Sequence, residues 1–232
     1  MPGADETGMG DVERARWWSE RSPYLVMVRD PQERRHFAPA AARNCGPILD
    51  VLGRHLPQAG TILEIGSGTG QHIVAFAQAH PGLIWQPSDP DPLARESIAA
   101  WIATSGLGNV RPPLDLNVMQ AGWEVPLGWL QGIVCINLLH IAPWAASVGL
   151  MAGAGRALEA GAPLYIYGAF KRGGRHTSES NAWFDRSLRH RDPAWGLRDV
   201  EAVEECAAAH GLEFVEVVSM PANNLSLIFR RR

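Results

Sequence analysis

Apolar positions along the chain alternate between short runs and longer segments with helical spacing. Four apolar runs have the length of strands: residues 61–64, 83–87, 132–139 and 163–170. Four longer segments place apolar side chains on one face of a helix: residues 39–56, 71–80, 91–105 and 148–159. Strands that alternate with helices in this way predict a single α/β domain with a mostly parallel sheet.

The C-terminal part departs from this alternation. Asp199 is expected to cap a helix that ends near His210, and two apolar segments, 213–220 and 224–230, then follow with only a short connection. Such a connection predicts an antiparallel hairpin, because parallel neighbours need a longer crossover. A further short strand is expected within residues 109–116. The pattern therefore predicts a doubly wound sheet that ends in a hairpin.

Composition narrows the class of protein. The chain has 232 residues and a formal net charge of −3, so no general basic field argues for nucleic-acid binding. Its three cysteines, Cys45, Cys135 and Cys206, stand apart and match neither a disulfide framework nor a metal-ligand spacing. The first thirty residues resemble no signal peptide, and no apolar run is long enough to span a membrane. We expect a cytoplasmic monomer or homodimer without a metal.

The segment EIGSGTGQH, residues 64–72, follows the first strand, and ligands of doubly wound sheets bind beyond the carboxyl ends of strands. Its glycines, Gly66, Gly68 and Gly70, have G-x-G-x-G spacing, whereas dinucleotide sites use G-x-G-x-x-G. Glu64 would repel a pyrophosphate but attract a cationic amino-acid group. The motif therefore favours S-adenosylmethionine (SAM), with S-adenosylhomocysteine (SAH) as the product.

Two other strand ends offer acids for the nucleoside part of SAM. Asp89 lies nineteen residues after Gly70, where it could accept hydrogen bonds from both ribose hydroxyls. The carboxylate of Asp115 could accept from the adenine amino group while the amide of Leu116 donates to the ring. The alternative is that these acids only cap helices.

Nine segments together resemble the methyltransferase-like protein 26 family, which comprises class I SAM-dependent methyltransferases. They are RHFAPAAARN, LEIGSGTGQH, WQPSDPD, LDLNV, INLLHIAPW, YGAF, HTSESNAWFD, RDPAWGLRD and MPANNLSLIFRR. The resemblance covers residues 35–232 and implies a Rossmann-like fold with seven strands. It implies that residues 64–70, including Ser67, form the SAM loop, Asp89 the ribose acid, and Asp115 with Leu116 the adenine contact. Residues 1–34 lie outside it and are a candidate cap.

Further side chains are expected around the cofactor. Arg43 and Asn44, on the helix before the first strand, could reach over SAM, and Asn137 ends a buried strand beside its methionine part. His140, three residues later, is the first candidate for a general base or for a group that orients the acceptor. Tyr167 could present its hydroxyl to the same pocket. The alternatives are a histidine bonded to backbone and a tyrosine of the core.

Residues 171–198 form a connection longer than a strand-to-helix loop needs, as lids and specificity elements often are. Four residues are candidate substrate contacts: Trp144 as an apolar wall, Arg175 and Arg198 as partners of an anionic group, and His176 at the rim. The alternative for the arginines is a solvated basic face.

These features predict a SAM-dependent methyltransferase that modifies the nitrogen or oxygen of a small molecule, which could be anionic. Three alternatives stay open. The first is an RNA or protein methyltransferase that uses residues 171–198 to hold its substrate. The second is a SAM-binding regulatory module without turnover, and the third is a nicotinamide-dependent dehydrogenase.

Overall fold

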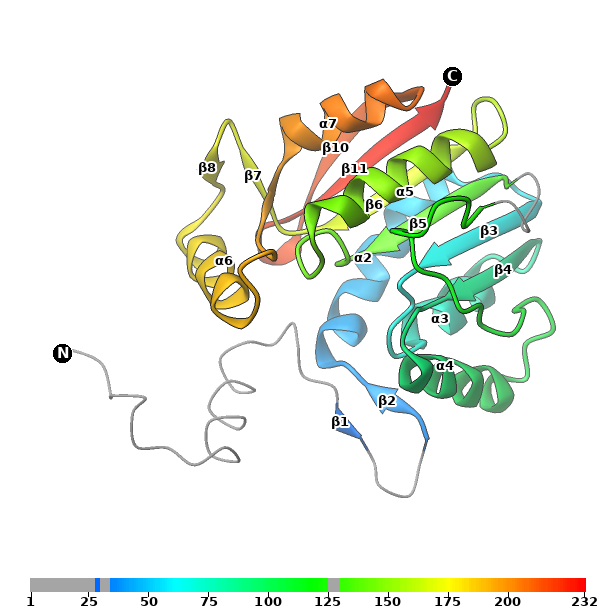
Figure 1. Cartoon of the computed structure of the whole chain (residues 1–232). Helices are drawn as coiled ribbons and strands as arrows, with labels where there is room; N and C mark the ends of the chain where they lie inside the picture. Colours follow the sequence, from blue (N-terminus) through cyan, green and yellow to red (C-terminus); the bar gives the residue numbers. More distant parts are fainter. Residues whose placement is uncertain (1–27, 30–33, 125–129) are drawn as a thin grey trace, which may run out of the picture.

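The computed structural model describes residues 28–29, 34–124 and 130–232. Their main feature is one six-stranded sheet (Figure 1). In spatial order its strands are β10 (Leu212–Met220), β11 (Asn224–Arg231), β6 (Pro163–Gly168), β5 (Gly132–Ile136), β3 (Gly60–Ile65) and β4 (Leu83–Ser88). The four strands from β6 to β4 are parallel, and β11 runs antiparallel to both of its neighbours, β6 and β10. The mostly parallel sheet and its C-terminal hairpin are thus confirmed.

The seventh strand expected within residues 109–116 does not form. Only two isolated bridges, Trp85 with Val110 and Ser88 with Leu114, extend the sheet beyond β4. Pro112 and Pro113 stand between these bridges and have no backbone N–H to donate, so a continuous ladder cannot form there. The sheet therefore has six strands rather than seven.

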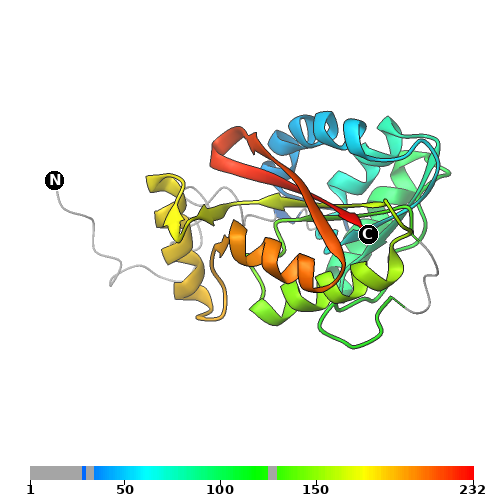
Figure 2. The ribbon, with the colours of Figure 1, turned by 90° about the horizontal axis from the view of Figure 1, so that it is seen from above.

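Helices cover both faces of the sheet (Figure 2). One face carries α2 (Pro39–His55), α3 (Gln71–Ala79) and α4 (Pro92–Ser105), and the other carries α5 (Trp144–Ala157) and α7 (Val200–Ala209). Alternate side chains of β5 enter the two cores: Ile133 and Cys135 pack toward α5, whereas Val134 and Ile136 pack toward α2. A strand buried on both faces needs the continuous apolar run seen in the sequence.

One helix start and one helix cap differ from expectation. The helix expected from residue 148 begins four residues earlier, at Trp144, and Pro143 occupies its N-cap position. Asp199 does occupy the N-cap position of α7, but its side chain does not cap the helix. The Asp199 carboxylate instead accepts a 2.6 Å hydrogen bond from the amide of Gly174.

Residues 170–199 form an ordered lobe at the carboxyl end of β6, where no helix was expected. The lobe comprises β7 (Phe170–Arg172), β8 (Arg175–His176), α6 (Glu179–Arg191) and β9 (Arg198–Asp199), with its strands in the order β8-β7-β9. Ser178 caps α6 by accepting from the amide of Asn181, and Phe184 and Leu188 pack against Leu197.

The remaining elements are short. Strands β1 (Val28–Arg29) and β2 (His36–Phe37) pair before α2. The turn η3 (Pro221–Asn223) joins β10 to β11, with Ala222 and Asn223 at φ 57° and 59°. Two successive left-handed residues make the tight turn that suits the twist of a hairpin. The expected cap, residues 1–34, lies almost wholly outside the described residues. Among the helices that the structure describes, none is long and apolar enough to cross a membrane.

Candidate functional site

The candidate site lies where the chain order of the sheet reverses, between the carboxyl ends of β3 and β5. From β3 the chain passes to β4 on one side, whereas β5 on the other side of β3 continues to β6. Loops at such a point diverge and leave a crevice for a ligand. The turn after β3 contains three glycines in the left-handed region: Gly66 (φ 66°), Gly68 (φ 55°) and Gly70 (φ 89°).

Gly68 and Gly70 serve different purposes. A Cβ on Gly70 would lie 2.8 Å from the Cα of Ile98, so this glycine lets α3 and α4 approach each other. A Cβ on Gly68 would meet no atom within 4 Å. Gly68 therefore borders open space. This is expected where the backbone approaches a ligand closely.

Asp89 fastens the glycine turn to the end of β4. Its Oδ2 accepts a 3.0 Å hydrogen bond from the amide of Gly68, and its Oδ1 accepts one of 3.0 Å from the amide of Asp91. The amide of Ser67 also donates to the carbonyl of Ser88 at 2.9 Å. Because a carboxylate oxygen has two lone pairs, Asp89 can still accept hydrogen bonds from a ligand.

Glu64 is 1% exposed, and its Oε2 has no hydrogen-bond partner. Burial raises the pKa of Glu64 to about 8, with the negative charge of Asp89 adding to the rise and a hydrogen bond from Ser67 opposing it. The pKa of Cys45 is raised by burial and then by Glu64. A buried carboxyl with an unsatisfied oxygen is costly unless a donor or cation reaches it. This local arrangement suits a cationic ligand group.

A mostly apolar cavity of about 240 Å³ adjoins the turn, large enough for a flat ring. Its lining residues include Gly66, Leu116, Asn117, Leu138 and Ile141. The structure thus brings Leu116 into the crevice beside the glycine turn. Asp115 does not line this cavity: its side chain is 72% exposed and forms an ion pair with Arg95 at 3.1 Å.

Helix α2 contributes Asn44 to this side of the sheet, next to Arg43. The Oδ1 of Asn44 lies 2.7 Å from Nε2 of His72, and burial lowers the pKa of His72 to about 4. His72 follows the glycine turn on the first helical turn of α3, and no role was predicted for it. Its position at the end of the motif was the available signal.

The loop after β5 begins at Asn137, which has φ 59° and donates its amide to the carbonyl of Tyr167 at 2.8 Å. His140 is buried, with its ring packed edge-on against Phe184 at 5.3 Å. A Cβ on Gly168 would lie 3.1 Å from Nδ1 of His140, so the ring lies close to the end of β6. Burial, and then the charge of Arg198, lower the pKa of His140 to about 3. The ring is therefore neutral at pH 7.

The two tyrosines of β6 both face the α2 side, as strand alternation predicts. Tyr165 is fully buried, and its hydroxyl lies 2.7 Å from the hydroxyl of Ser226, so Tyr165 is a core residue. Tyr167 pairs with Ile136 nearer the carboxyl end of the strand, beside the loop that carries His140.

The four predicted substrate contacts form two separate pairs. The guanidinium of Arg198 donates to the carbonyls of Leu139, Ala142 and Ala194 and lies 5.9 Å from the ring centre of Trp144. Through these bonds Arg198 holds the loop after β5, and its contact with an anionic group stays a prediction. The other two residues, Arg175 and His176, lie on exposed β8, with His176 Nε2 2.9 Å from Asp185.

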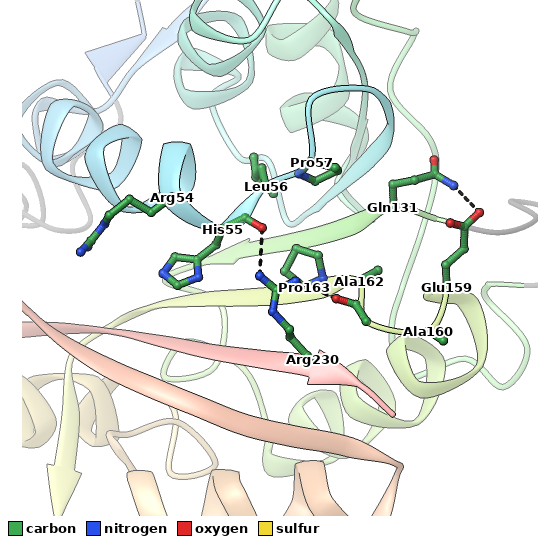
Figure 3. A pocket seen from close by; sticks show the side chains of 11 residues that line it. Arg54, His55, Leu56, Pro57, Gln131, Glu159, Ala160, Ala162, Pro163 and Arg230 are labelled. Carbon is green, nitrogen blue, oxygen red and sulfur yellow. Dashed lines mark hydrogen bonds between the residues drawn. The ribbon is translucent and has the colours of Figure 1, made fainter.

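A larger cavity, of about 420 Å³, lies at the opposite ends of the central strands, and its lining residues are drawn in Figure 3. There Arg230 donates to the carbonyls of Gly161 at 2.7 Å and His55 at 3.5 Å, and thereby ties the end of β11 to the turn before β6 and to the end of α2. This cavity is at the amino ends of β5 and β6, away from the glycine turn. In the described part of the chain, no three His, Cys, Asp or Glu side chains come together as a metal site.

Comparison with known families gives one match that covers most of the chain. Residues 35–231 match the family described as "Protein of unknown function (DUF938)". The chain belongs to the DUF938 family. The match does not confirm the resemblance to the methyltransferase-like protein 26 family, which stays a prediction.

Many solved structures share this fold. An O-methyltransferase family protein from Burkholderia thailandensis superposes with a TM-score of 0.69 at 20% identity, over 83% of this chain and 57% of that protein. The mitomycin 7-O-methyltransferase MmcR gives 0.70 at 15%, over 84% and 55%. The SAM-dependent methyltransferase SibL gives 0.70 at 18%, over 99% and 63%. The chain therefore has the Rossmann-like class I methyltransferase fold but spans only 55–63% of these proteins' lengths.

Proposed function

We propose that this DUF938 protein binds SAM at the carboxyl ends of β3 and β5 and transfers its methyl group to the nitrogen or oxygen of a small molecule. The observation that carries the proposal is the buried Oε2 of Glu64, which lacks a hydrogen-bond partner beside the open face of Gly68. An ammonium group could pair with that oxygen and favour the ionised form of Glu64, whose pKa burial raises to about 8 without a ligand.

The other parts of SAM have matching residues. Asp89 would accept hydrogen bonds from the ribose, and the cavity lined by Leu116 and Leu138 would hold the adenine. Arg43, Asn44 and Asn137 would lie around the methionine part. A dinucleotide fits less well, because its pyrophosphate would approach the acidic pair formed by Glu64 and Asp89.

When bound, SAM supplies an electrophilic methyl group, so the protein must align the acceptor and exclude water. Of the two roles considered for His140, its low pKa favours orientation of the acceptor over proton abstraction. A neutral imidazole can accept a hydrogen bond from an N–H or O–H group without taking the proton. Tyr167 would contribute a hydroxyl from the neighbouring strand.

The proposed acceptor is a small molecule. The neighbouring folds include an enzyme named for methylating mitomycin, which supports a small-molecule acceptor here. Arg198 is already bonded to three carbonyls, so an anionic acceptor would depend on other cations.

Two measurements test the function. Isothermal titration with SAM, SAH and NAD should show binding of SAM and SAH, and binding of NAD alone would overturn the proposal. Incubation with methyl-labelled SAM and a metabolite extract should then label a small product. Label found only in RNA or protein would favour a macromolecular acceptor. Binding of SAM without any labelled product would favour a regulatory module.

A further inference from the structure

The segment just before α2, residues 35–38, lies against the glycine turn and is joined to it by two side chains. We propose that this segment, here called the strap, fastens over the turn through Ser97 and Gln71, and that its docking is linked to occupation of the cofactor crevice. This inference rests on the proposed function, because the linked ligand is SAM or SAH.

The first connection runs through Ser97 on α4, which is completely buried. Its hydroxyl accepts a 2.7 Å hydrogen bond from the amide of His36 and donates one of 2.7 Å to the carbonyl of Thr69. Thr69 lies between Gly68 and Gly70, so a single hydroxyl joins the strap to the centre of the turn. Hydrogen bonds in such a chain strengthen each other.

The second connection runs through Gln71, the first residue of α3. Its Oε1 accepts hydrogen bonds from the amide of Ala38 at 2.5 Å and from the hydroxyl of Thr69 at 3.2 Å. Thr69 is thus held to the strap through its carbonyl by Ser97 and through its hydroxyl by Gln71. The docked strap restricts the part of the turn that borders the crevice.

The outer side of the strap is anchored by Trp101 on α4. The indole Nε1 of Trp101 donates to the carbonyl of His36 at 2.9 Å, and the guanidinium of Arg35 lies 5.0 Å from the ring centre. Neither of these contacts involves a residue of the glycine turn. They leave Ser97 and Gln71 as the two links that reach the turn.

Linkage follows from these contacts. Ligand binding must order the turn in the conformation that the strap stabilises, so a docked strap reduces the entropy cost of binding. By reciprocity, a bound ligand must stabilise the docked strap to the same extent. Ser97 and Gln71 are therefore positioning residues, since they act on the ligand through the turn.

The test uses hydrogen exchange at the amides of His36 and Ala38, with SAH as the ligand. In the wild-type protein, saturating SAH should slow exchange at both amides about tenfold. Ser97→Ala should weaken SAH binding about five- to tenfold and reduce this protection. Thr104→Ala is the matched control, because its hydroxyl bonds only carbonyls within α4.

A second pair of variants covers the case in which Ser97→Ala does not fold. Gln71→Leu removes both acceptor bonds at a half-buried site and should weaken SAH binding and strap protection together. Gln71→Glu retains an oxygen that can accept both bonds, so SAH affinity and strap protection should be close to those of the wild type. If SAH binds but exchange at His36 and Ala38 is unchanged, the strap proposal is wrong and the proposed function stands. Failure of the wild-type protein to bind SAM or SAH would overturn both proposals.

Discussion

The amide of Gly68 donates a 3.0 Å hydrogen bond to Oδ2 of Asp89, and this bond joins the turn after β3 to the end of β4. The two residues are 21 positions apart in the sequence, yet they form one wall of the candidate site. The carboxylate thus shapes the turn and, in the proposed function, also receives the ribose.

Asp89→Ala should weaken SAH binding by about 1 to 3 kcal/mol, because the ligand loses a charged acceptor and the turn loses its anchor. Isothermal titration measures the loss. Asp91→Ala is the control: Asp91 caps α4 by accepting from the amide of Leu93, so its removal should lower stability and spare affinity. Unchanged affinity in Asp89→Ala would remove this residue from the site.

Alanine at Gly70 should mainly lower stability, whereas alanine at Gly68 should mainly lower SAH affinity. Gly70→Ala brings a methyl group against the backbone of Ile98 and should lower the free energy of unfolding by about 1 to 3 kcal/mol. Gly68→Ala meets no protein atom and should cost about 1 kcal/mol in stability. Its methyl group would instead occupy the crevice and reduce SAH affinity. Thermal unfolding and titration separate the two effects, and normal SAH binding by Gly68→Ala would place the ligand elsewhere.

Glu64 should make the protein less stable as pH rises. Its pKa is raised by burial from 4.5 to about 8, so between these values the unfolded chain has released the proton that the folded protein retains. Stability attributable to Glu64 therefore falls across this window, by at most about 1.4 kcal/mol per pH unit. Urea unfolding from pH 5 to 8 should show a shallower decline in Glu64→Gln than in wild type.

The same Glu64→Gln variant should bind SAM more weakly, because an amide cannot provide the negative charge for the ammonium. Higher relative stability combined with lower affinity is the expected signature of a functional buried acid. Parallel pH profiles for the two proteins, with equal affinities, would show that Glu64 has neither role.

His140→Gln should reduce turnover more than SAM affinity, since His140 is proposed to orient the acceptor. Because burial lowers its pKa from 6.5 to about 3, the unfolded chain takes up a proton first as pH falls below 6.5. The contribution of neutral His140 to stability is thus lost on acidification, and the variant should lose less stability between pH 7 and 4. Equal losses of turnover and affinity would instead assign His140 a purely structural role.

Arg198→Lys should destabilise the loop after β5, because an ammonium cannot reach the carbonyls of Leu139, Ala142 and Ala194 with the geometry of a guanidinium. We expect a loss of about 1 to 3 kcal/mol in unfolding free energy together with lower turnover. Exposed Arg175 is the comparison, and Arg175→Ala should leave stability unchanged. A raised KM in Arg198→Lys with unaltered stability would support direct contact with an anionic acceptor.

Local patterns in the sequence were sufficient for most of the fold. The buried strands β5 and β6 are apolar runs, and the glycines after β3 mark a turn whose φ angles suit glycine. The strand predicted within residues 109–116 was wrong, although Pro112 and Pro113, which interrupt the ladder, stand in the sequence. Helix α6 could not be seen in this way, because its few apolar residues, such as Phe184, pack against distant segments of the chain.

The sequence alone placed Glu64 at a strand end beside a glycine turn, because residue spacing sets where a strand ends. The expectation of a cationic cofactor followed from that position. The partners of the other side chains were decided only by tertiary packing. Asp115 pairs with Arg95 on the surface, His72 with Asn44, and Ser97 with both His36 and Thr69. Such contacts depend on how separate elements pack around the sheet, and no spacing along one segment contains that information.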